Sequence, residues 1–217
     1  MKKSILIILA LLSTSAIFGQ SISIGSEVGF ISSINTDYTI TDFENRRNTY
    51  YSGLNVNYKY NHRLSFTSGI HYLRQGYRHS TCYIFEEGVK NQLTGKIDFL
   101  TLPLIANIHI GKSKRFVASV GLLGNYNIKA VQDYPEPIGG CLIGYPEDLT
   151  ETTQNFGFGG IAGIGYKLFD NDNFEGIFMI KYYQGLSNTF KNPYSFDYDI
   201  NKKYSSVLST LTLNYKL

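Results

Sequence analysis

Four histidines are the side chains of this sequence best suited to move protons: His62, His71, His79 and His109. Serines are plentiful, so a histidine base would activate a serine nucleophile if the fold brought the two into hydrogen-bond reach. No spacing singles out such a pair, and the usual nucleophile, phosphate-binding and zinc-protease motifs are missing from the sequence. His71 and His109 have no evident third ligand. The sequence therefore predicts a protein that is not an enzyme and has no metal site or cofactor.

Charged side chains and histidines also recur in the polar phase of a two-residue alternation that runs through the chain. If this phase lines the inside of a closed sheet, its charges must pair or hydrogen-bond there, because an unpaired buried charge is costly. We predict a network that plugs the interior, with a proton or ion path as the alternative. The predicted members are Glu27, Lys59, Arg63, His71, His109, Lys167, Glu175 and Lys181.

Two cysteines, Cys82 and Cys141, fall in consecutive long polar segments and have no metal-binding spacing. A pair of thiols can oxidise after export, so a disulfide that ties the two segments together is predicted. Such a bond would restrain two segments that are far apart in sequence. Two free thiols are the alternative, because the geometry of long loops cannot be read from sequence.

The stretch Tyr204–Leu217 shows the kind of element that would position these residues. Apolar side chains such as Leu211 and Leu213 alternate there with polar ones such as Thr210 and Thr212. Successive side chains of a strand point to opposite faces, so the stretch predicts a strand with one apolar and one mostly polar side. A last strand of this kind can pair with its predecessor and with the first strand, which closes a barrel.

Seven further segments alternate in the same way, and the connections between them are alternately long and short. This rhythm predicts an all-β fold: an eight-stranded antiparallel up-and-down transmembrane β-barrel with short periplasmic turns and long outer loops. Pro103 lacks a ladder donor, so a bulge or local break in pairing is expected there. The expected strands are about Ile22–Ile34, Tyr50–Tyr60, Arg63–Gln75, Lys96–Ile110, Arg115–Ile128, Asn155–Phe169, Phe174–Leu186 and Tyr204–Leu217.

The alternation alone does not tell which phase faces outward, since a soluble ligand-binding barrel would place its apolar phase inside. The polar phase is mostly Gly, Ser, Thr and Asn, which would make a poor water-exposed surface. Aromatic residues of the apolar phase gather near segment ends, as interfacial girdles do. Charged residues are 17% of the chain, against about 25% in soluble proteins. We therefore predict that the apolar phase faces lipid.

The N-terminus has the features of a secretory signal peptide: a basic start at Lys2 and Lys3, a short apolar run, and small residues near its end. We predict residues 1–19 as the signal peptide and residues 20–217 as one outer-membrane barrel domain. An uncleaved anchor helix is the alternative. The net charge of +3 is small and no basic helix is apparent, so nucleic acid is not an expected partner.

The segment Phe99-Leu100-Thr101-Leu102-Pro103-Leu104-Ile105 resembles the aromatic-Leu-x-x-Pro-Leu strand of PorT-like outer-membrane β-barrel proteins of Bacteroidota. The signal-peptide end Gly19-Gln20 is also similar to that of exported proteins from this group. The resemblance covers essentially the whole mature chain. It implies an eight-stranded barrel in the bacterial outer membrane and, for some members, a link to protein secretion. It implies no catalytic residues.

Together these observations predict an integral outer-membrane barrel whose outer loops act in binding, adhesion, or a secretion-accessory or assembly role. A narrow channel for ions or small solutes is the first alternative, and a membrane-embedded lipid-modifying enzyme is the second. The expected partners are outer-membrane lipid and lipopolysaccharide, with an envelope or secretion-system protein as a further candidate. Ordinary solvation is the expected state of the basic residues in or beside the outer loops, and lipopolysaccharide contact is the alternative, because arginine forks match phosphate oxygens. These residues are Arg46, Arg47, Arg74, Arg78 and Lys96.

Overall fold

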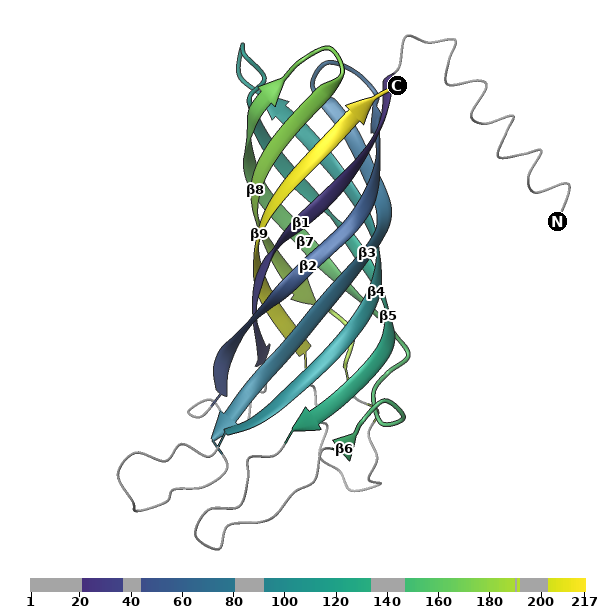
Figure 1. Ribbon diagram of the computed structural model, residues 1–217, viewed down its shortest axis with the longest axis vertical. Coiled ribbons are helices and arrows are strands. Elements are labelled where there is room, and N and C mark those ends of the chain that lie inside the picture. Colours follow the sequence, from purple (N-terminus) through teal and green to yellow (C-terminus); the bar gives the residue numbers. More distant parts are fainter. Residues whose placement is uncertain (1–20, 37–43, 81–91, 134–146, 190, 192–202) are drawn as a thin grey trace, which may run out of the picture.

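The computed structural model describes residues 21–36, 44–80, 92–133, 147–189, 191 and 203–217, which form a closed antiparallel barrel (Figure 1). The expected eight-stranded all-β barrel is confirmed, and a further strand of two residues, β6, lies against the end of β5. No helix within the described ranges is long and apolar enough to cross a membrane. The predicted signal peptide lies outside these ranges. The strands are β1 (Ser21–Thr36), β2 (Glu44–Lys59), β3 (Leu64–Ser80), β4 (Gln92–Ile110), β5 (Phe116–Asp133), β6 (Glu147–Asp148), β7 (Phe156–Asp170), β8 (Phe174–Gly185) and β9 (Lys203–Lys216).

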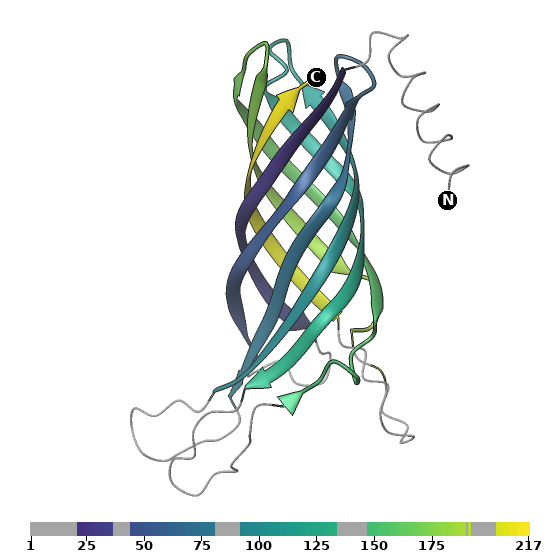
Figure 2. The ribbon, with the colours of Figure 1, turned by 45° about the vertical axis from the view of Figure 1, so that its right-hand side comes forward.

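Pairing between the first and last strands closes the barrel, as the alternation in the final stretch predicted. β1 pairs antiparallel with β9, from Ser23 opposite Lys216 to Thr36 opposite Lys203. The other barrel strands pair with their neighbours in chain order. The short β6 is not part of the barrel wall, so the barrel neighbour of β5 is β7. Closure matters because an unpaired backbone group costs several kcal/mol in hydrocarbon. The strands are inclined to the barrel axis, and the short turns share one end with the C-terminus (Figures 1 and 2).

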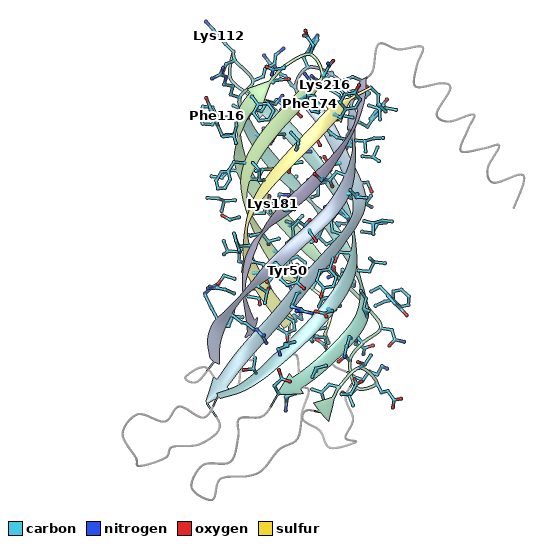
Figure 3. The ribbon with its side chains drawn as sticks, in the orientation of Figure 1. Tyr50, Lys112, Phe116, Phe174, Lys181 and Lys216 are labelled. Carbon is cyan, nitrogen blue, oxygen red and sulfur yellow. The ribbon has the colours of Figure 1, made fainter. Side chains whose placement is uncertain are left out.

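The apolar phase of the strands faces outward, as predicted. Leu54, Leu104 and Ile164 are 67%, 57% and 70% exposed although their side chains are entirely apolar. In water such a surface would be a very large hydrophobic patch, whereas the hydrocarbon of a bilayer solvates it. Side chains project outward from the wall along the whole length of the barrel (Figure 3). The outer surface therefore fits a lipid environment.

Aromatic pairs mark both ends of this apolar band. Rings at these levels form the girdles that outer-membrane barrels place at the two interfaces of the bilayer. Phe116 and Phe174 lie near the short-turn end in Figure 3, and Tyr50 lies closer to the opposite end. The contacting pairs are Phe116–Tyr166 and Phe174–Tyr215 at the short-turn end, and Tyr50–Tyr72 and Tyr126–Phe156 toward the loop end.

Strands β2 to β5 run further toward the loop end than the alternation indicated. The β3–β4 ladder continues to Ser80 opposite Gln92, whereas the β5–β7 ladder stops at Tyr126 opposite Phe156. The added residues are mostly polar or glycine, so no apolar phase marked them as strand. Backbone hydrogen bonds do not need that phase, and they continue beyond it. One side of the wall therefore extends past the other, and we call this part the strand extension (Figures 1 and 2).

Pro103 interrupts one ladder of β4 without shifting its register. On the β5 side it pairs with Leu123. On the β3 side the ladder has no pairs for Gly69 and Ile70, although the pairs before and after them keep the same register. The proline nitrogen carries no hydrogen to donate, which explains the gap. The expected local break in pairing is confirmed.

Candidate functional site

The buried ion pair of Glu27 and Lys181 joins β1 to β8 inside the lumen. Only 2% of the Glu27 side chain and 4% of the Lys181 side chain are exposed. Lys181 Nζ donates to Glu27 Oε1, and Asn55 Nδ2 donates to Oε2 over 3.3 Å. Figure 3 shows Lys181 between the levels of Phe174 and Tyr50, which is within the apolar band. The carboxylate is thus satisfied at a depth where no bulk water reaches it.

A hydrogen-bond chain extends this pair toward His71. His71 Nε2 lies 2.6 Å from Asn55 Oδ1, and the Tyr51 hydroxyl contacts His71 Nδ1. The Asn55 nitrogen already donates to Glu27, so its oxygen accepts, and all groups are satisfied when His71 carries its proton on Nε2. Gly53 leaves room for the imidazole, because a Cβ there would lie 2.1 Å from His71 Cδ2. The chain ends at Tyr51, which is itself buried.

A second ion cluster lies near the short-turn end of the lumen. Lys167 Nζ is 2.5 Å from Glu175 Oε1, and both side chains are buried. Lys167 also lies 3.2 Å from Asp170, which in turn contacts Lys216 at 2.6 Å. Asn214 Nδ2 donates to the second oxygen of Glu175 over 3.3 Å. The cluster ties β7, β8 and β9 together at the point where the seam with β1 begins.

Ser65 and His109 form a buried pair, with 3.1 Å between Oγ and Nε2. A serine bonded to a histidine is one half of a nucleophile–base arrangement. The other imidazole nitrogen, Nδ1, has no hydrogen-bond partner among the described residues, so no third group orients the base. Both residues line a cavity of about 30 Å³, which has room for one or two water molecules. A lipid substrate does not fit there.

Apolar side chains fill most of the remaining lumen. Leu73 and Leu208 are fully buried, and they belong to one cluster with Ile31 and Phe99. A second cavity, of about 20 Å³, lies beside Tyr183 and has room for about one water. An eight-stranded barrel is just wide enough for its own side chains. The interior of this barrel is accordingly packed.

Six of the eight predicted lumen residues lie in or beside these clusters, and two do not. Arg63 is exposed in the turn before β3, which corrects its predicted lumen position. Asn61 Oδ1 accepts from the backbone nitrogens of Arg63 and Leu64, each at 2.8 Å, and this turn takes Arg63 out of the strand alternation. Lys59, the last residue of β2, is half-buried and joins neither ion cluster.

Sequence reasoning missed the neutral partners of the charged groups, namely Tyr51, Asn55 and Ser65. They lie in the inward phase of β2 and β3. The alternation therefore placed them inside the barrel but did not show that they bond to the charged groups. The signal that would have found them is the register. Counting back from the Asn61 turn pairs Gly53 with His71, which places the imidazole beside the neighbouring inward residues of β2.

Three of the basic residues that were candidates for lipopolysaccharide contact hold the strand extension together. Arg74 forms two bonds to the Asp98 carboxylate, at 2.6 and 2.7 Å. Arg47 Nη1 donates to the Gly95 carbonyl over 2.9 Å, and Lys96 pairs with an aspartate on β5. Arg46 is exposed. The side chain of Arg78 lies outside the described residues, as do Cys82, Cys141 and the proposed disulfide.

A closed wall with an apolar outer face, aromatic girdles and a packed polar interior defines an integral β-barrel protein of the bacterial outer membrane. The sequence matches the family model of the outer membrane protein beta-barrel domain over residues 18–191, and the chain belongs to this family. The protein is therefore located in the bacterial outer membrane.

Solved structures with similar folds come from several bacteria. Ail, the attachment invasion locus protein of Yersinia pestis, is 14% identical, with a TM-score of 0.45 over 91% of this chain and 99% of Ail. Neisserial surface protein A is 12% identical, with a TM-score of 0.45 over 89% of this chain and 97% of that protein. OprG of Pseudomonas aeruginosa is 13% identical, with a TM-score of 0.35 over 92% of this chain and 96% of OprG. No curated protein matches the sequence.

Proposed function

We propose that the protein is a membrane-embedded scaffold that binds a partner through its outer loops and passes no solute through its lumen. The observation that carries this proposal is the packed interior, in which the Glu27–Lys181 pair and the apolar cluster leave cavities of about 30 and 20 Å³. A diffusion path needs a continuous column of water, and these side chains are held in place by hydrogen bonds and packing. The surfaces left for function are the wall and the two ends.

The loop end is the better candidate for the binding surface because the strand extension prepares it. Arg74 and Asp98 fasten β3 to β4, and Lys96 and Asp133 fasten β4 to β5. A pre-ordered edge loses less conformational entropy on binding than a free loop does. Protein binding, adhesion or assembly at this end is favoured over transport on these grounds.

Within this proposal, we assign the chain to the PorT-like branch of Bacteroidota and give it a secretion-accessory role. The support is the segment Phe99–Ile105 in β4, whose Pro103 coincides with the gap in the β3–β4 ladder. The partner is then a protein of the envelope or of a secretion system.

Two measurements test the proposed function, one on the purified full-length protein and one on the full-length protein in cells. In planar bilayers we expect no stepwise ionic conductance, and discrete conductance steps would favour the narrow-channel alternative. A photo-crosslinking residue at Lys129, which is exposed at the loop end of β5, should capture an envelope or secretion protein in cells. The same residue at Lys112, in a turn at the opposite end, is the matched control. Capture from position 112 alone would contradict the assignment of function to the loops.

A further inference from the structure

The short-turn end of the barrel carries a one-sided band of positive charge. The band consists of residues in or beside the β2–β3 and β4–β5 turns, and we call it the basic arc. The sequence has no acidic residue from position 57 to 68 or from 106 to 120. His109 N donates to the Arg63 carbonyl over 2.7 Å, so the two turns lie side by side. The basic arc comprises Arg63, Lys112, Lys114 and Arg115.

The other side of the same rim is electrically balanced. There Lys216 is bound to Asp170, and Asp172 adds a second exposed carboxylate in the β7–β8 turn. By contrast, Arg63, Lys112 and Lys114 have no ion-pair partner within the part of the chain that the structure describes. The positive charge is thus concentrated over β2 to β5 and is available to a ligand.

The aromatic girdle fixes the depth of the basic arc in the membrane. Arg115 Nη1 donates to the Tyr166 hydroxyl over 3.3 Å, and the next residue, Phe116, packs edge-on against the same ring. Tyr60, beside the β2–β3 turn, is 56% exposed on the outer face. Aromatic rings of this kind lie at the level of the lipid headgroups. The cations next to them therefore lie at the level of the lipid phosphates, and Figure 3 shows Lys112 beyond Phe116 at this end.

The β4–β5 turn, which carries Lys112 and Lys114, has two residues in the left-handed backbone region. Lys114 has a φ of 54° and Gly111 a φ of 84°, which are both left-handed conformations. Glycine or asparagine adopts such a conformation more easily than lysine does. Lys114 N donates to the Gly111 carbonyl over 3.3 Å, so the turn is closed around this residue. A replacement at position 114 must therefore tolerate the left-handed region, as asparagine does.

We propose that the basic arc binds the phosphate groups of anionic phospholipids, with phosphatidylglycerol as the representative, in the leaflet that faces the periplasm. Short turns face the periplasm in barrels of this architecture. Arginine and lysine bind lipid phosphates at this level by charge-assisted hydrogen bonds. Because the arc covers only β2 to β5, the bound lipids collect on one side of the barrel. This lipid site does not depend on the function proposed for the loops.

The test compares two sets of charge removals in the full-length protein. The test variant is Arg63→Gln/Lys112→Gln/Lys114→Asn, in which asparagine tolerates the left-handed backbone at position 114. The control variant, Arg46→Gln/Lys129→Gln/Lys191→Gln, removes the same charge from the loop end. Each protein is reconstituted into phosphatidylethanolamine bilayers with a minor share of phosphatidylglycerol. Lipids retained after detergent extraction are then counted by native mass spectrometry.

We expect the natural protein and the control variant to retain phosphatidylglycerol above its share in the bilayer. The test variant should lose affinity by about fivefold for each charge removed, and high salt should weaken the enrichment. Migration on gels with and without boiling confirms that all three barrels are folded. The proposal is overturned if the natural protein shows no enrichment, in which case an acidic protein is the better candidate ligand. It is also overturned if the test variant retains the lipid or if the control variant loses it equally.

Discussion

Glu27 and Lys181 illustrate how a charged pair can specify a barrel interior. Each neutralises the other, and Asn55 occupies the second carboxylate oxygen at 3.3 Å. Such a pair is not necessarily more stable than apolar side chains of the same volume. Removing one partner, however, leaves an uncompensated charge in the lumen. The pair therefore penalises any register of β1 and β8 that separates its two members.

The first prediction concerns this pair. Lys181→Met should lower the free energy of unfolding by about 3–5 kcal/mol, because Glu27 is left buried and unpaired. The double variant Glu27→Gln/Lys181→Met should recover most of that loss. The folded fraction as a function of urea, read from the gel shift between unboiled and boiled samples, measures both. Lys129→Met, at an exposed position, is the control and should change little. Equal losses in the single and double variants would contradict the prediction.

At the residue scale, the sequence predicted positions better than partners. Period-two alternation placed Glu27, His71 and Lys181 inside, because a strand fixes the face of each side chain. It did not reveal that Glu27 meets a lysine far along the chain, since that contact depends on the curvature of the closed wall. Arg63 was predicted as the first residue of a strand, but it belongs to the Asn61 turn, and β3 begins one residue later at Leu64.

The seam between β1 and β9 is the element on which closure depends, and Gly25 lets the two strands approach. A Cβ at Gly25 would lie 2.5 Å from the Leu213 carbonyl oxygen and 2.1 Å from Asn214 Oδ1. The carbonyl belongs to the ladder itself, so it cannot move without disturbing the pairing. At Gly160 on β7, by contrast, an added Cβ meets nothing within 4 Å.

The second prediction compares these two glycines. Gly25→Val should destabilise the barrel by about 1–3 kcal/mol, which is typical of overpacking, whereas Gly160→Val should leave stability nearly unchanged. Both substitutions restrict the unfolded chain in the same way. The difference between the two losses of stability therefore measures how tightly β1 and β9 are packed at the seam. Urea midpoints of the heat-resistant form provide the measurement. A larger loss at position 160 than at position 25 would show that the seam tolerates a side chain.

At the element scale, the sequence predicted the barrel strands and missed the loop-side ends of β2 to β5. The apolar phase stops where the wall leaves the hydrocarbon, but the β3–β4 ladder continues to Ser80 and Gln92. The apolar alternation therefore indicates where the strand leaves the membrane, whereas the length of the strand is set by its backbone hydrogen bonds. The effect of Pro103 was predictable because it follows from a missing donor hydrogen, which is a local property.

The third prediction tests the orientation of the whole molecule in lipid. Leu104 lies within the outward apolar band of β4, and Ile110 ends the same strand at the short-turn side. Leu104→Arg should cost about 2–4 kcal/mol, and Ile110→Arg about 0–1 kcal/mol, since the cost of a cation on the lipid face falls toward the interfaces. Folding yields and urea midpoints in lipid vesicles measure the two costs. Equal costs, or a natural protein that stays dissolved without detergent, would contradict the lipid-facing assignment.

At the scale of the whole molecule, the fold was predictable and the candidate sites were only partly so. Eight alternating segments and the loop rhythm contain enough information for a closed barrel. The basic arc was not recognised from sequence, because Arg63 and Lys112 belong to different hairpins, whose turns become neighbours only when β3 pairs with β4. The loops that carry the proposed function have no repeating pattern from which their geometry can be read.

The seam also dictates an order of events in biogenesis. Ser23, near the start of the first strand, is joined to Lys216, near the end of the last. Local hairpins form early, but this contact spans nearly the entire polypeptide, and pairings so distant in sequence form slowly. Until they form, the apolar side chains of a newly exported chain are exposed to water, and the chain is prone to aggregate. We expect a chaperone to bind the chain between its release into the periplasm and the pairing of its first and last strands in the bilayer.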